Sequence, residues 1–144
     1  MFFKIYIGPG SVDKFLRESY SKIRKIADEH NCEKAFFIRY ADPDWHVRLR
    51  IKLTETSSYQ KILEKVSEII EPYRGGGIIS GVLMDEYQPE FQRYGGTELT
   101  SLAESLFDID SYICSVGLRV LSTSGHGSSK NKAYLAMHLS LIHI

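Results

Sequence analysis

Cysteine is scarce in this 144-residue chain, which has only Cys32 and Cys114, far apart and without a CxxC pattern. Two distant thiols make neither a disulfide framework nor a cysteine metal site, and they are typical of reduced thiols in the cytosol. Long apolar runs are missing as well: no stretch has the length of a membrane span, and Lys4 interrupts the short apolar N-terminus. We therefore expect a cytoplasmic protein without a signal peptide.

Net charge is also absent, because 18 basic residues balance 18 acidic ones. A domain whose whole surface binds nucleic acid usually has a basic excess, so the composition disfavours that class while leaving room for a local basic patch. The chain has no GxGxxG or Walker pattern, and its glycine clusters at 75–77 and 95–96 are typical of chain breaks rather than phosphate loops. We expect no cofactor and no metal ion.

What the chain does contain is the hydrophobic periodicity of an α+β domain. Apolar residues alternate in four segments and follow helical spacing in two, and the length suits one domain. The expected strands cover residues 2–7, 35–40, 46–53 and 78–87, and the expected helices cover residues 11–30 and 58–73. The order strand, helix, strand, strand, helix, strand predicts a ferredoxin-like βαββαβ sheet-and-helix unit over about residues 2–88.

Further helices are expected behind this unit. An irregular segment at 89–96 precedes two stretches of helical spacing, at 98–107 and 111–120. Asp108–Asp110 is expected to join them, with Asp110 as the N-cap of the second helix. Residues 122–138 begin as a polar loop without periodicity and are expected to lead into a truncated continuation.

The third expected strand sorts its side chains by charge. Its period of two places His46, Arg48, Arg50 and Lys52 on one face and Val47, Leu49, Ile51 and Leu53 on the other. In a ferredoxin-like sheet the helices cover one face, so the aliphatic side should meet them and the cationic side should look outward. Arg39 in the second strand shares a face with Phe37, and we expect it to join the cationic side across the hairpin. Arginine suits carboxylates and phosphates because its planar fork donates two parallel hydrogen bonds.

A plainer interpretation of this strand stays open, since any half-exposed strand with a solvated face alternates in the same way. Side chains of one sign on one face nevertheless repel one another without an anion or an acidic partner. Only Asp42 and Asp44 lie nearby in sequence, and an Asp in a turn is more often structural than catalytic.

A second unusual stretch, Asp85–Gly96, combines acids, aromatics, Arg93 and a glycine pair at the exit of a strand. Binding loops often lie at such places. An ordinary strand-to-helix connection explains the same composition and also stays open.

The two stretches together carry a resemblance. Residues 36–50, FFIRYADPDWHVRLR, resemble the pattern FFIRYxDPxxHLRLR, and residues 87–96, YQPEFQRYGG, resemble YxPExxRYGG. Both patterns occur in the C-terminal glutamate-elimination domain of lanthipeptide dehydratases and in thiopeptide-type bacteriocin biosynthesis proteins. Leu106-Phe107 and Asp110-Ser111 are similar to the family's following LFxxDS segment. Neither motif is specific alone, but their order and separation match over most of residues 2–120.

The resemblance implies a lyase-type enzyme of bacteriocin biosynthesis. In such dehydratases a glutamyl-tRNA-dependent partner or domain attaches glutamate to Ser or Thr of a ribosomal precursor peptide. The elimination domain then removes an α-proton and expels glutamate, which leaves a dehydroamino acid. A related branch of the family joins two dehydroalanines into a pyridine ring, and that alternative stays open.

The resemblance and the basic face together suggest site residues. Fixed guanidinium groups stabilise a leaving carboxylate and an enolate-like transition state without reorganising. His46 is expected either to transfer a proton or only to orient a neighbour. The candidate catalytic residues are Arg39, Arg48, Arg50, His46 and Arg93. The candidate substrate-binding residues are Lys4, Tyr40, Asp42, Glu90 and Tyr94.

Two non-catalytic functions compete with the enzyme. A sheet face with Phe37, Arg39, Arg48 and Arg50 resembles an RNA-binding platform in outline, although aromatics for stacking are few and the RNP patterns are missing. A module that holds a leader peptide on a sheet edge is the other possibility.

The resemblance implies a longer domain whose later part supplies further active-site residues, including a catalytic His. We therefore expect residues 1–121 to be the front part of an elimination-type domain that is inactive by itself. Residues 139–144, LSLIHI, match what one reading frame of a common sequencing-library adapter encodes, so we expect an artefact there. His143 lies in that tail and is not expected to be the missing base, whereas a role for His126 and His138 stays open beside the plainer interpretation as surface histidines.

Overall fold

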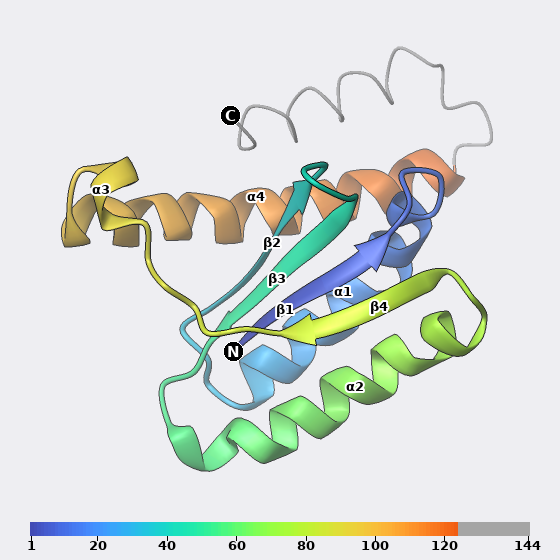
Figure 1. The fold of residues 1–144 in the computed structure, drawn as a ribbon. Coiled ribbons are helices and arrows are strands. Elements are labelled where there is room, and N and C mark those ends of the chain that lie inside the picture. Colours follow the sequence, from blue (N-terminus) through green and yellow to red (C-terminus); the bar gives the residue numbers. More distant parts are fainter. Residues whose placement is uncertain (124–144) are drawn as a thin grey trace.

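A computed structural model describes residues 1–123 and shows an α+β fold built on a four-stranded antiparallel sheet (Figure 1). The expected order of the first six elements is confirmed, with ends within a few residues of those predicted. The strands are β1 (Phe2–Ile7), β2 (Lys34–Tyr40), β3 (His46–Lys52) and β4 (Ile79–Met84). The helices are α1 (Val12–Glu29), α2 (Tyr59–Gly75), α3 (Phe91–Tyr94) and α4 (Thr97–Thr123), with a 3-10 turn at Thr56–Ser58. The expected artefact at 139–144 and nearly all of the polar stretch lie outside the described residues.

The sheet has the strand order β2-β3-β1-β4, as the ferredoxin-like prediction requires. One face packs against α1 and α2 and forms the main core, whose most deeply buried side chains include Ile5, Phe15, Tyr20, Ile51 and Ile62. These residues come from alternate strand positions and from every third or fourth helix position, which is the pattern that buries one side of each element. No helix among residues 1–123 is long and apolar enough to cross a membrane.

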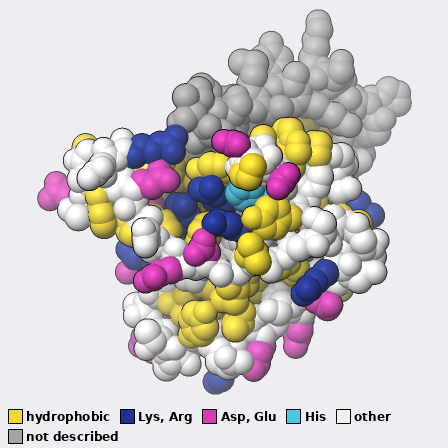
Figure 2. All heavy atoms as spheres, viewed as in Figure 1, with side chains coloured by type: hydrophobic (Ala, Val, Ile, Leu, Met, Phe, Trp, Pro, Cys, Tyr) yellow, Lys and Arg dark blue, Asp and Glu magenta, His cyan; other side chains and the backbone are white. Residues whose placement is uncertain are grey.

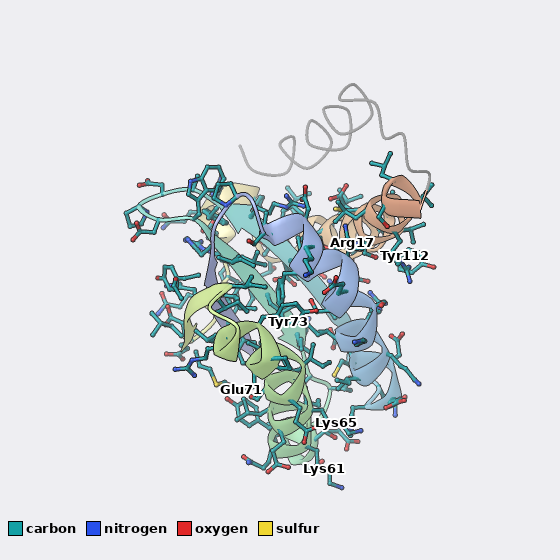
Figure 3. All side chains as sticks on the ribbon, turned by 90° about the vertical axis from the view of Figure 1, so that its right-hand side faces the viewer. Arg17, Lys61, Lys65, Glu71, Tyr73 and Tyr112 are labelled. Atoms are coloured by element: carbon teal, nitrogen blue, oxygen red, sulfur yellow. The ribbon has the colours of Figure 1, made fainter. Side chains whose placement is uncertain are left out.

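Helices α1 and α2 lie side by side on the covered face (Figure 3). Tyr73 of α2 packs edge-on against Phe15 and donates a 2.9 Å hydrogen bond to Glu18 Oε2 of α1. Burial, helped by that carboxylate, raises the pKa of Tyr73 to about 12. Lys65 lies 3.6 Å from a carboxylate oxygen of Glu29 across the same seam. The covered face is therefore joined by both apolar packing and paired polar groups.

The prediction of two helices after residue 97 was wrong, because α4 is one continuous helix (Figure 1). Asp108, which suggested a break, and the following Ser111 face the edge strand β2 instead of ending a helix. Asp108 Oδ1 accepts a hydrogen bond from the backbone N–H of Ala35 at 3.0 Å and pairs with Arg24. Ser111 Oγ accepts from the Phe37 N–H at 3.0 Å and donates to the Phe37 carbonyl oxygen at 3.2 Å. The helix thereby satisfies backbone groups that an edge strand leaves unpaired.

The hairpin register overturns one further expectation. Tyr40 lies opposite His46, Ile38 opposite Arg48 and Phe36 opposite Arg50, so these side chains share the open face. Phe37 and Arg39 lie opposite Leu49 and Val47 and point to the helix-covered face. The prediction that Arg39 joins the cationic face was wrong. Alternation within each strand was predicted correctly, but the register between the strands was not.

Candidate functional site

The open face of the sheet brings together Lys4 of β1 and His46, Arg48 and Arg50 of β3, which we call the basic face. Lys4 lies opposite Arg48 in the β1–β3 pair, and Tyr6 lies opposite His46. In Figure 2, Lys and Arg side chains gather beside a histidine on this face. Five of the ten candidate residues, these four and Tyr40 opposite His46, are thus neighbours because of sheet register alone.

His46 holds Arg48 in one orientation. The His46 ring is only 4% exposed and lies between the rings of Tyr40 and Tyr6, with centroids 5.5 and 5.4 Å away. Its Nε2 accepts a 3.1 Å hydrogen bond from Arg48 Nε, and its Nδ1 lies 2.7 Å from the carbonyl oxygen of Asp44. Since an arginine Nε–H can only donate, the pattern fits the tautomer whose hydrogen is on Nδ1. Both ring nitrogens are therefore engaged within the fold.

Arg48 is held from a second side by Tyr40, whose ring centroid lies 3.6 Å from the guanidinium carbon. A cation over an aromatic face at this distance is attracted to it and restrained in direction. The candidate residue Tyr40 thus contributes through the orientation of Arg48.

Arg50 lies among aromatic rings. Its guanidinium carbon is 4.4 Å from the ring centroid of Tyr87, 5.1 Å from that of Phe2 and 5.8 Å from that of Phe36. Its Nε is buried and has no hydrogen-bond partner within residues 1–123. A buried donor without an acceptor costs on the order of 1–3 kcal/mol, so the fold holds Arg50 in this position at an energetic cost.

A cavity of about 350 Å³ opens where the basic face meets the segment after β4. Its lining residues are Phe2, Lys4, Arg48, Arg50, Asp85, Glu86, Tyr87, Gln88 and Glu90. We call it the cationic cavity. Neither of its arginines has a carboxylate within 4 Å among the residues that the structure describes, whereas Lys4, Arg24, Arg39, Lys52 and Arg93 each have one. Two oriented guanidinium groups without a protein counter-ion fit a carboxylate or another planar anion.

Of the three cations that line this cavity, Lys4 alone has a carboxylate partner among residues 1–123. Its Nζ lies 2.6 Å from Asp85 Oδ2. This hydrogen bond, together with the backbone N–H of Glu86, holds the pKa of Asp85 below its usual range. The Lys4 charge is therefore already offset while Asp85 is ionised.

The motif residues of α3 lie beside the cationic cavity rather than inside it. Arg93 pairs with Glu90 at 3.2 Å and lines a shallow outer hollow with residues 89–92. Glu90 lines both that hollow and the cationic cavity. Tyr94 packs against Phe107 of α4, and burial raises its pKa against the opposing charge of Arg93. The structure therefore brings Arg93 and Tyr94 near the site without placing them in its lining.

Two predicted site residues lie elsewhere. Asp42 is exposed in the turn between β2 and β3 and does not line the cationic cavity. Arg39 lies on the covered face, where its Nη1 is 2.7 Å from Asp13 Oδ1 of α1. Burial raises the pKa of the nearby Cys114 to about 12, and the Arg39 charge opposes that shift. Arg39 therefore has a structural environment that ties β2 to α1 and α4.

Sequence reasoning missed a buried polar group at the back of the site. The Tyr87 hydroxyl donates a hydrogen bond to Glu104, which is 7% exposed and 3.8 Å from Lys34 Nζ. Burial, followed by this hydrogen bond, raises the pKa of Tyr87. Tyr87 belongs to a quoted motif and was available as a signal, but Glu104 lies in a helix and carries no motif. Within residues 1–123 no three His, Cys, Asp or Glu side chains converge on a possible metal site.

Comparisons with known proteins agree on one family. A family model described as "Lantibiotic biosynthesis dehydratase C-term" matches residues 1–144. The nisin biosynthesis protein NisB of Lactococcus lactis subsp. lactis is 35% identical over 114 residues, which cover 78% of this chain and 11% of NisB. The subtilin biosynthesis protein SpaB of Bacillus subtilis is 31% identical over 96 residues, which cover 67% of this chain and 9% of SpaB. The chain thus spans about a tenth of the length of these relatives.

One solved structure agrees with the same family, and a second is similar in fold alone. The tRNA-dependent lantibiotic dehydratase MibB from Microbispora sp. 107891 superposes with a TM-score of 0.73 at 26% identity, over 85% of this chain and 12% of MibB. TsrL superposes with a TM-score of 0.55 at 18% identity, over 83% of this chain and 34% of TsrL, which is a likeness of fold alone.

Proposed function

We propose, because the chain belongs to the lantibiotic biosynthesis dehydratase C-terminal family, that its basic face promotes elimination of glutamate from a glutamylated precursor peptide. The observation that supports this proposal is the pair Arg48 and Arg50. Both border the cationic cavity, both are restrained by rings, and neither has a carboxylate partner among the described residues. A site of this kind is built for an anion that arrives with the substrate.

The proposed reaction develops negative charge at two places. A base removes the α-proton of the glutamylated Ser or Thr, the electron pair forms the Cα–Cβ double bond, and the Cβ–O bond breaks. Glutamate then leaves as a carboxylate, while negative charge develops on the carbonyl oxygen next to Cα. In this proposal Arg48 and Arg50 stabilise the leaving carboxylate and that oxygen. Donors that are already oriented stabilise such charge without a reorganisation cost.

Other candidates receive narrower roles. We assign His46 to the positioning of Arg48 rather than to proton transfer, because both of its ring nitrogens are engaged. Arg93 is proposed to guide the acidic substrate at the rim, since it lines the outer hollow. The proposal assigns Arg39 no contact with the substrate, and it assigns the base that removes the α-proton to no residue of this chain.

The test is Arg48→Ala in the longer dehydratase that contains this segment, supplied with glutamylated precursor peptide. Mass spectrometry should show the glutamyl adduct persisting and the dehydrated product falling by about 10²–10³-fold, which is typical for loss of one transition-state donor. Arg17→Ala is the matched control, because Arg17 lies on α1 beside Glu18 and away from the cationic cavity. Normal dehydration by the Arg48 variant would refute the proposal.

The same assay distinguishes the competing functions. Consumption of a peptide that already contains dehydroalanine, with no use of the glutamyl adduct, would favour the pyridine-forming branch. Retention of the leader peptide without any turnover would favour a binding module. Salt-dependent RNA binding by the 144-residue chain would favour an RNA platform, although Phe2 and Phe36 on the open face are at most 6% exposed and offer little surface for base stacking.

A further inference from the structure

Tyr87 and Glu104 share a buried hydrogen bond that the proposed chemistry does not use. The Tyr87 hydroxyl donates to a carboxylate oxygen of Glu104 on α4, and Glu104 is nearly buried. Burial and this hydrogen bond raise the pKa of Tyr87, so its hydroxyl keeps the proton and donates throughout the neutral range. The bond joins the segment after β4 to a helix that begins ten residues later in the chain.

The Glu104 end of this hydrogen bond is held in place by β2. Glu104 Oε2 lies 3.8 Å from Nζ of Lys34, and both side chains are shielded from water. Lys34 Nζ also donates a 2.8 Å hydrogen bond to the carbonyl oxygen of Ser101, which lies one turn before Glu104 in α4. Partly buried ion pairs are screened much less than exposed ones. Glu104 is therefore an acceptor whose own position is set by two elements of the fold.

Tyr87 needs such an acceptor because its backbone lies outside the sheet. Residues 85–90 connect β4 to α3 without regular secondary structure. The other two rings near Arg50, those of Phe2 and Phe36, belong to β1 and β2, whose backbones are held by strand pairing. The Tyr87 ring is held by side-chain contacts instead, which are the bond to Glu104 and an edge-on contact with Phe2.

The Tyr87 ring in turn restrains Arg50. It is the nearest of the three rings, with its centroid 4.4 Å from the guanidinium carbon. A cation over an aromatic face is attracted to it. Arg50 Nε has no hydrogen-bond partner within residues 1–123, whereas the Nε of Arg48 is fixed by His46. The orientation of Arg50 thus depends on rings, and Glu104 sets the position of the nearest one.

We propose that Glu104 is a positioning residue for the elimination, which holds Arg50 in its active orientation through the hydroxyl of Tyr87. This inference rests on the proposed function of the cationic cavity and adds a residue that does not line that cavity. Glu104 contacts neither the substrate nor the reacting atoms. Loss of its bond to Tyr87 lowers the rate of the chemical step rather than the affinity for the peptide, because Arg50 acts on charge that develops in the transition state.

The experiment is steady-state kinetics of elimination by the longer dehydratase, with glutamylated precursor peptide as substrate. Tyr87→Phe keeps the ring and removes only the hydroxyl, so kcat should fall about tenfold while KM changes by less than about threefold. Glu104→Leu should have the same effect, and Glu104→Gln should recover most of the activity, since its amide oxygen accepts from the phenol. An unchanged kcat in Tyr87→Phe, or a raised KM with an unchanged kcat, would overturn the inference.

A double variant tests whether the two residues act through one bond. Tyr87→Phe combined with Glu104→Leu should be no slower than either single variant, because each substitution removes the same hydrogen bond. Losses that multiply in the double variant would show two independent effects and would overturn the inference.

The covered face supplies a matched control. Tyr73 of α2 also donates a hydrogen bond to a glutamate, Glu18 of α1, at 2.9 Å (Figure 3). Tyr73→Phe removes that bond far from the cationic cavity, so it should lower thermal stability about as much as Tyr87→Phe and leave kcat unchanged. An equal fall of kcat in both variants would mean that Tyr87 acts through stability alone, and the inference would fail.

Arg50→Ala separates this inference from the proposed function. It should lower kcat about 100-fold, and Tyr87→Phe should cause no further loss in that background, since the side chain that it positions is gone. If Arg50→Ala eliminates glutamate normally, the proposed function fails. If instead Arg50→Ala loses activity while Tyr87→Phe and Glu104→Leu keep the kcat of the parent, only the positioning role of Glu104 fails.

Discussion

Arg39 and Arg48 lie on adjacent strands of one sheet, yet they point to opposite faces and meet different surroundings. Arg39 faces the helices and pairs with Asp13 at 2.7 Å. Arg48 faces outward, is held by a histidine and a tyrosine ring, and has no carboxylate within 4 Å among residues 1–123. Arg39 on the covered face has a carboxylate partner within the fold. Arg48 on the open face is oriented by uncharged side chains and can pair with an anionic ligand. An arginine that is oriented only by uncharged side chains is therefore a better candidate for ligand binding than an arginine that is paired with a carboxylate.

The largest expected effect contrasts these two arginines directly. In the longer dehydratase, Arg39→Ala should keep glutamate elimination within about threefold of the parent, whereas Arg48→Ala should lose about 100-fold or more. Arg39→Ala should instead destabilise the fold by about 1–2 kcal/mol, a modest value because Asp13 is 55% exposed and screened by water. Product analysis and thermal unfolding measure the two effects. A loss of elimination at Arg39 as large as at Arg48, in a folded variant, would contradict the contrast between the two faces.

The next largest effect concerns the free energy of unfolding, which depends on the contact between α4 and β2. Ser111→Ala should lower the free energy of unfolding by about 1–3 kcal/mol, because it leaves the buried N–H of Phe37 without its acceptor. Ser105→Ala, in the same helix, removes only a bond to a carbonyl of its own helix and should change stability by about 0.5 kcal/mol or less. Chemical denaturation of the 144-residue chain measures both. Equal effects of the two substitutions would show that α4 does not support the edge of β2 in this way.

On the open face, His46 can be tested for positioning against proton transfer. His46→Ala should reduce elimination about tenfold, because Arg48 loses the acceptor that orients it. His46→Gln should recover most of the activity, since its amide oxygen can accept from Arg48 Nε. If both variants are equally inactive and the activity of the parent protein depends on a group that titrates near the usual pKa of histidine, proton transfer by His46 is the better account.

The smallest expected effect concerns Lys4, whose charge on the open face is already paired with Asp85. Asp85→Asn should release Lys4 and strengthen binding of a glutamyl peptide about two- to fivefold, more at low salt than at high salt. Because the Asp85 pKa is lowered, the pair forms fully above the usual Asp range and is lost only as pH falls through the depressed value. The parent chain should therefore show no gain from Lys4 release between about pH 8 and pH 5. Calorimetry at two salt concentrations tests this; an unchanged affinity in the Asn variant would exclude Lys4 from anion binding.

Much of this fold was predictable because local patterns and burial agreed. The alternation of apolar residues predicted the strands, and their helical spacing predicted the first two helices, with errors of a few residues at the ends. The later helix was wrongly predicted as two helices. That error came from Asp108–Asp110, whose polarity suggested a break, although the side chains of Asp108 and of the following Ser111 contact β2. Their side chains are used by the edge strand 70 or more residues earlier in the chain, and no local pattern encodes such a distant partner.

The candidate site was predictable in part for a related reason. Arg48, Arg50, His46 and Lys4 were named from strand alternation and motif resemblance, and they share one face. Glu104 was missed, because its contacts with Tyr87 and Lys34 join three segments that are distant in sequence. The roles of all these residues stay predictions until the variants are measured.

The sequence by itself determined that β3 carries cations on one side and aliphatics on the other, since alternation is a property of a single extended strand. Only the tertiary structure decided which side of β2 accompanies those cations. Tyr40 pairs with His46, and a hairpin connection one residue longer or shorter would have turned Arg39 outward in place of Tyr40. Register depends on the turn and on what the helices bury, so it follows from packing of the whole chain rather than from either strand alone.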